Sequence, residues 1–101
     1  MASLYDLGEG VWIRSAFTNP LTGAAMDPAT VRVKVLAPSA ATGSGVFKVY
    51  GTDTEVIKES TGIYAMLVTG SEAGLWQYRW EGENVAPAVQ EGSFVVRRSS
   101  L

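Results

Sequence analysis

Hydrophobic and polar residues alternate along most of the chain with a period of two. Val31, Val33 and Val35, for example, alternate with Arg32 and Lys34. Successive side chains of a β-strand point to opposite faces, so the pattern predicts strands with one buried and one solvated face. Clusters of glycine, proline, serine and threonine separate the segments and predict turns. The predicted strands cover residues 11–17, 30–36, 46–50, 55–59, 62–69, 74–82 and 88–97.

Seven short strands, spaced by about 8–14 residues, are typical of an all-β sandwich or barrel. No segment has the 3.6-residue periodicity of a helix. We therefore predict an all-β fold, an immunoglobulin-like antiparallel β-sandwich of about seven strands with no significant helix. Residues 46–50 and 55–59 flank the turn formers GTDT, so we expect them to pair as a hairpin.

The length of 101 residues is that of one domain. The first seven residues, MASLYDL, precede the first alternating segment and are predicted to form an N-terminal arm, which either lies on a neighbouring subunit or is frayed. We assign residues 8–97 to the sandwich. Residues 98–101 are predicted to be a flexible tail, because chain ends are poorly ordered unless something holds them.

The segment Gly74–Gly82 places three aromatic residues, Trp76, Tyr78 and Trp80, at alternate positions. On a strand these rings share one face, and Gln77, Arg79 and Glu81 share the other. Such a row could be an exposed binding platform or an inner wall of the fold. The wall is favoured, because the platform would bury the charged side chains. A core rich in aromatic rings would also stabilise a sandwich that has no disulfide.

Composition excludes several classes of function. The chain has no cysteine and no histidine, which removes disulfides, thiolate catalysis and the commonest general base and transition-metal ligand. Its net charge of −2 provides no positive field for nucleic acid. No apolar run approaches the roughly 18 residues of a membrane span, and no secretory signal is recognisable. We expect synthesis in the cytosol and neither a nucleic-acid nor a membrane partner.

The ten acidic residues form no recognisable catalytic or calcium-binding pattern. Glu81 and Glu83 could act as a carboxylate pair, but a solvated rim beside Gly82 is the favoured interpretation. The serines lack the G-x-S-x-G context of a nucleophile. We therefore predict no catalytic, cofactor-binding or metal-binding residue, no cofactor and no enzyme activity.

An ordered set of segments resembles a family of small structural proteins of tailed bacteriophages that have an immunoglobulin-like sandwich. The resemblance covers about residues 4–96. It runs through YDLGEGVWIRSAFT, MDPATVRVKVLAP, KVYGTDTEVIKESTGIYAMLVT, GLWQYRWEG and EGSFVV. The segment APSAATGSG departs from the tight P-x-G turn that such proteins often have at this place.

The resemblance implies a virion component, either a head decoration subunit or a part of the neck or tail. Its partners would be other virion proteins, in a multi-copy or homo-oligomeric assembly. We predict protein contacts through the arm and the end of the last strand, at Leu4, Tyr5, Leu7, Arg97 and Arg98. The alternative function is a carbohydrate-binding or host-surface adhesive module, which requires exposed aromatic rings.

Overall fold

The structure is a computed structural model that describes residues 3–40, 45, 47–85 and 88–98. The described residues form eight strands in two sheets and contain no helix, which confirms the predicted all-β sandwich. The strands are β1 (Ser3–Asp6), β2 (Gly10–Ala16), β3 (Val31–Leu36), β4 (Lys48–Val49), β5 (Val56–Ser60), β6 (Ile63–Thr69), β7 (Gly74–Gly82) and β8 (Val89–Arg97).

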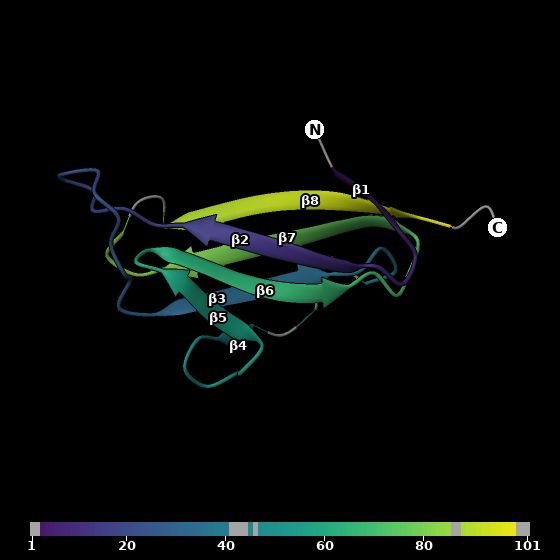
Figure 1. Cartoon of the computed structure of the whole chain (residues 1–101), viewed down its shortest axis with the longest axis horizontal. Helices are drawn as coiled ribbons and strands as arrows, with labels where there is room; N and C mark the ends of the chain where they lie inside the picture. The colour runs from purple at the N-terminus through teal and green to yellow at the C-terminus, as the bar shows by residue number, and fades with distance from the viewer. Residues whose placement is uncertain (1–2, 41–44, 46, 86–87, 99–101) are drawn as a thin grey trace.

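One sheet has five strands in the order β1-β8-β7-β3-β4, and the other has three in the order β2-β6-β5. The two sheets face each other along the length of the molecule (Figure 1). All pairs are antiparallel except β1 and β8, which run parallel. The placement of β2, β6 and β5 in one sheet and β3, β7 and β8 in the other follows the immunoglobulin pattern.

The inner faces of both sheets form one core. Trp80 and Val33 have no exposed surface, and Phe17 is 1% exposed. The ring of Trp76 stacks on Phe94 of the neighbouring strand, with 5.7 Å between the ring centroids. Tyr78 is half-buried and packs against this core. The aromatic row of β7 is therefore an inner wall, as the sequence predicts.

The expected hairpin between residues 46–50 and 55–59 does not form. β4 pairs with β3 in the five-stranded sheet, whereas β5 pairs with β6 in the other sheet. The Asp53 carboxylate accepts a hydrogen bond from the Val49 amide at 2.8 Å, and the Asp53 amide donates to the Val49 carbonyl. This tight turn directs the chain away from β4 and across to the other sheet. Val46, the first residue of the predicted strand, lies outside the described residues.

Part of the predicted N-terminal arm is a strand in the structure. Ser3–Asp6 is strand β1, which adds in parallel to the edge of the five-stranded sheet, with Leu4 opposite Val95. Backbone hydrogen bonding and the burial of Tyr5 explain why the segment joins the sheet. Residues 1–2 and residues 99–101 of the predicted tail lie outside the described residues.

Candidate interaction surface

The structure divides the three predicted contact residues of β1 and its following turn into two groups. Leu4 and Leu7 are 56% and 45% exposed, which leaves them available to a partner. Tyr5 instead points inward and meets the ring of Phe94 edge to face at 5.8 Å. Since alternate residues of a strand point to opposite faces, Leu4 and Tyr5 cannot share one surface. Tyr5 is therefore partly buried against the core, on the opposite face from Leu4.

The two predicted arginines lie at the end of β8. Arg97 donates from Nε to the Asp6 carboxylate at 2.7 Å, which ties β8 to β1. This hydrogen bond is the main cause of the raised pKa of Arg97. Arg98 is exposed just after the strand. The Arg97 guanidinium is thus already paired within the chain.

An apolar row crosses the outer face of the five-stranded sheet, and we define it by Leu4, Val95 and Leu75. Val95 lies opposite Leu4 of β1 and also opposite Leu75 of β7, so the three side chains are cross-strand neighbours on one face. Leu75 is 47% exposed. Sequence reasoning found Leu4 but missed the other two. The available signal was that Leu75 occupies an outward position of β7, where the following outward residues are Gln77, Arg79 and Glu81.

Polarity increases along this outer face, away from the apolar row. Beyond Leu75 and Val95, the next outward pair is Gln77 opposite Ser93, which is uncharged. The pair after that is Arg79 opposite Glu91, which is charged. From the row to the third pair, the outer face of β7 and β8 thus changes from apolar through uncharged polar to charged.

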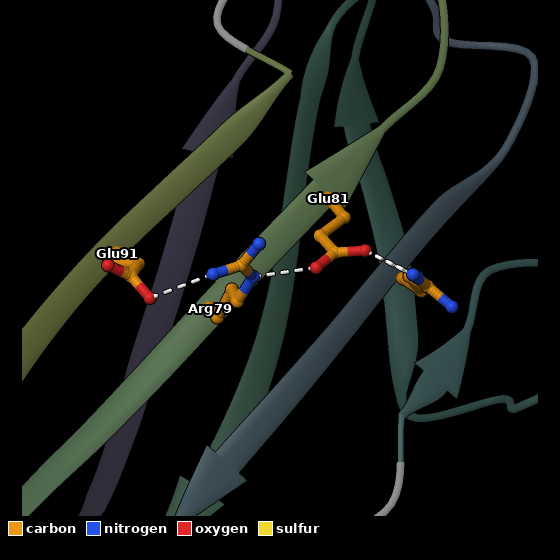
Figure 2. A network of polar contacts seen from close by, with 4 residues as sticks. Arg79, Glu81 and Glu91 are labelled. Atoms are coloured by element: carbon orange, nitrogen blue, oxygen red, sulfur yellow. Dashed lines mark hydrogen bonds and ion pairs between the residues drawn. The ribbon is translucent and has the colours of Figure 1, made fainter. Parts of the chain in front are cut away.

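The charged end of the face holds a network of ion pairs (Figure 2). Arg79 donates from Nε to Glu81 at 2.6 Å and from Nη1 to Glu91 at 3.2 Å. Glu81 also accepts from Arg32 of β3 through Nε at 2.7 Å. Hydrogen bonds from Arg79 and Arg32 lower the pKa of Glu81 despite its partial desolvation. The network joins three strands and satisfies its own charges, so it is a solvated outer surface rather than an acid–base pair.

A second exposed apolar feature lies at the opposite end of the molecule. The connection between β2 and β3 projects beyond the sheets (Figure 1). We call residues 18–26 of this connection the tip loop. Leu21 at its apex is 93% exposed. No residue of the tip loop carries a charge. Sequence reasoning recognised turn formers here but did not identify Leu21 as a candidate contact residue.

Local hydrogen bonds fix the conformation of the tip loop. The Asn19 side-chain oxygen accepts from the Leu21 amide at 2.8 Å and from the Thr22 amide at 3.3 Å. The backbone amide of Asn19 donates to the Ala24 carbonyl, and the backbone amide of Gly23 donates to the backbone carbonyl of Asn19. The bond from Leu21 to the Asn19 side chain is that of an Asx-turn, in which an asparagine side chain replaces a backbone acceptor. Leu21 is therefore presented by an ordered loop.

Asp27 anchors the base of the tip loop to the three-stranded sheet. One carboxylate oxygen accepts from the Gly62 amide at 2.8 Å and from the Tyr64 hydroxyl at 3.2 Å. The other accepts from Lys58 Nζ at 2.6 Å. Gly62, in the turn between β5 and β6, also accepts from the Phe17 amide at 2.8 Å. Both ends of the loop are thus held at the same turn.

The charges at this anchor are fixed near neutral pH. The hydrogen bond from Lys58 is the main cause of the lowered pKa of Asp27. Burial, with the nearby Asp27 charge, raises the pKa of Tyr64 to about 12. A cavity of about 300 Å³ adjoins this anchor, and its lining includes Asp27, Tyr64, Tyr50 and Thr30. Near neutral pH, Asp27 is therefore ionised and Tyr64 is neutral.

Among the described residues, no group of three acidic side chains is arranged to hold a metal ion. The same part of the chain contains no helix of the length and hydrophobicity needed to cross a membrane.

Comparison with protein-family models and with curated proteins found no match. Among solved structures, the chain is similar to a crystal structure of a protein from Bacteroides vulgatus that is proposed to be a glycoside hydrolase. The TM-score is 0.58 and the sequence identity is 12%. The similar region covers 97% of this chain but 17% of that chain. At this identity the likeness concerns the fold alone.

Proposed function

We propose that this sandwich is a non-enzymatic docking module that binds other proteins in a multi-copy assembly. The observation that carries the proposal is the apolar row of Leu4, Val95 and Leu75 on the outer face of a solvated sheet. Outward strand positions of a sandwich are normally polar. Adjacent apolar residues at such positions are typical of a contact surface, because burying them against a partner removes apolar area from water.

The surroundings of the row support this role. Leu7 is exposed in the turn that follows β1, and Arg97 and Asp6 neutralise each other beside it. The neighbouring pair of Gln77 and Ser93 is uncharged. A partner could therefore cover the row and this ion pair without burying an unpaired charge, which would be costly.

We further propose that the assembly is the particle of a tailed bacteriophage, in which the module decorates the head or belongs to the neck or tail. The support is the ordered set of segments from YDLGEG to EGSFVV, together with a one-domain sandwich. Capsid, neck or tail subunits would then be the partners.

The test is whether the chain is present in purified particles of the phage that encodes it. Mass spectrometry of separated heads and tails should detect it in one of the two fractions. Leu75→Asp should reduce its incorporation, whereas Ile57→Asp, at an exposed isoleucine on the other sheet, should not. Particles that lack the wild-type chain would overturn the virion assignment. Equal incorporation of both variants would overturn the role of the row.

A second candidate is a carbohydrate-binding module. Trp12 on the outer face of the three-stranded sheet is 44% exposed, and exposed rings can stack on sugars. The structurally similar protein is proposed to be a glycoside hydrolase, and this chain corresponds to a small part of it. Titrating soluble glycans while following tryptophan fluorescence tests this candidate, with Trp12→Ala as the control. Absence of quenching across a glycan panel would reject it.

A further inference from the structure

We infer that copies of this chain associate head to tail, with the tip loop of one copy seated on the apolar row of the next. This inference rests on the proposed docking function and names its partner, a second copy of the chain. It begins from the positions of the two features. The tip loop lies at one end of a molecule with a long axis of 49 Å (Figure 1). Leu75 and Val95 lie near the other end, where β7 begins and β8 finishes (Figure 1).

The tip loop has the properties of an anchor. Leu21 is 93% exposed, whereas the backbone around it is held by the side chain of Asn19 and by the bond between Asn19 and Ala24. An ordered loop loses little conformational entropy when it binds, so more of the apolar contact contributes to affinity. Asp27 holds the base of the loop through Gly62 and Lys58, which fixes the direction of the tip.

The two features are complementary in chemistry. The tip loop carries no charge. The face that would receive it consists of the apolar row followed by the uncharged pair of Gln77 and Ser93. A tip that entered the charged end of the same face would instead desolvate Arg79 and Glu91. The receiving site is therefore the row with the uncharged pair, and the charged groups nearest to it, Arg97 and Asp6, already neutralise each other.

Their separation determines the kind of assembly. Each copy carries one tip and one row on different surfaces, so the contact is heterologous. Every copy that joins leaves one free tip and one free row in the complex. Such contacts form rings when the rotation closes and open arrays when it does not. Repeated copies are what the proposed function in a multi-copy assembly requires.

Sedimentation velocity of the purified wild-type chain tests this inference. A contact this small is expected to be weak, so concentrations should extend to about 1 mM. The weight-average mass should rise with concentration. Leu21→Asp and Leu75→Asp should each weaken the association at least about tenfold. Ile57→Asp, at an exposed isoleucine outside both features, should leave it unchanged. Circular dichroism verifies that each variant remains folded.

Mixing the two variants distinguishes this contact from any other. Leu21→Asp retains an intact row, and Leu75→Asp retains an intact tip, so an equimolar mixture should form dimers and nothing larger. The absence of native cysteine allows a second measurement, with Leu21→Cys and Leu75→Cys. Under mild oxidation the mixture should form disulfide heterodimers in excess of either homodimer.

A wild-type chain that stays monomeric at about 1 mM, or a variant mixture that stays monomeric while the wild type associates, overturns the inference. Heterodimers that do not exceed the homodimers also overturn it. If incorporation into particles still depends on Leu75 in that case, the row binds a different protein and the proposed docking function stands.

Discussion

The hydroxyl of Tyr64 donates to the carboxylate of Asp27 at 3.2 Å, which joins a core strand to the base of the tip loop. Tyr64 is 2% exposed, so its ionisation would place a charge in the core beside an existing carboxylate. Burial and the nearby Asp27 charge therefore raise the pKa of the phenol from 10.0 to about 12.

This relationship predicts a loss of stability at alkaline pH. The folded pKa of Tyr64 lies above the unfolded value of 10.0, so its contribution is fully present below pH 10 and is lost as pH rises towards 12. Urea unfolding across this interval should show the decline. Tyr64→Phe should show a smaller decline in stability. In an absorbance titration, the variant should lack the tyrosine of the wild type that ionises at the raised pKa of about 12. An unchanged decline in Tyr64→Phe would contradict the assignment.

Acid should weaken the network of ion pairs on the outer face of the five-stranded sheet. Hydrogen bonds from Arg79 and Arg32 hold the pKa of Glu81 below its ordinary value of 4.5. Its contribution is present above pH 4.5 and is lost as pH falls through the lower folded pKa. Unfolding free energies measured from about pH 5 to about pH 2 should fall less steeply in Glu81→Gln than in the wild type. Glu83→Gln is the control. If the unfolding free energies of both variants depend on pH in the same way, the prediction is contradicted.

Gly62 should tolerate substitution less well than Gly51. Both have positive φ, at +77° and +91°, where an alanine is strained by about 1–3 kcal/mol. At Gly62 an added Cβ would also lie 2.5 Å from the Phe17 carbonyl oxygen, whereas at Gly51 it would meet nothing within 4 Å. Gly62→Ala should therefore cost at least about 1 kcal/mol more than Gly51→Ala in chemical denaturation. Equal costs would show that the turn relaxes freely.

The buried Trp80 and the exposed Trp12 provide a further test. Trp80 has no exposed surface, so Trp80→Ala should cost about 3–5 kcal/mol of unfolding free energy. Trp12 is 44% exposed, and Trp12→Ala should cost under about 1 kcal/mol. Thermal and urea unfolding of both variants measure the difference. A similar cost for the two would be incompatible with an inward aromatic row on β7.

The strands with clear alternation were predictable from sequence because one face of each is buried. Gly74–Gly82 is predicted with its observed bounds, since glycines at both ends mark its turns. The placement of Lys48–Val49 was not predictable from local pattern. It depends on the turn that Asp53 forms with Val49, which leads the chain to the other sheet and leaves β4 paired with the preceding strand β3. Ser3–Asp6 was missed because its partner is β8, at the far end of the chain.

The candidate surface was predictable only in part. Leu4 and Leu7 stood out because they precede the first alternating segment. The row required the register that sets Val95 between Leu4 and Leu75, and no single strand contains that information. Leu21 looked like an ordinary loop residue, since the order of its loop comes from the side chain of Asn19 and its exposure from tertiary arrangement.

The parallel pairing of β1 with β8 has a consequence for the order in which the chain folds on the ribosome. Tyr5 and Val96 are register partners, although almost the whole sequence separates them. Synthesis proceeds from the N-terminus, so β1 must wait for its partner while β2 and β6 can already pair. Contacts between such distant segments are slow to form. Closure of the sheet edge at Tyr5 is thus expected to be a late step, and it completes the apolar row in the same event.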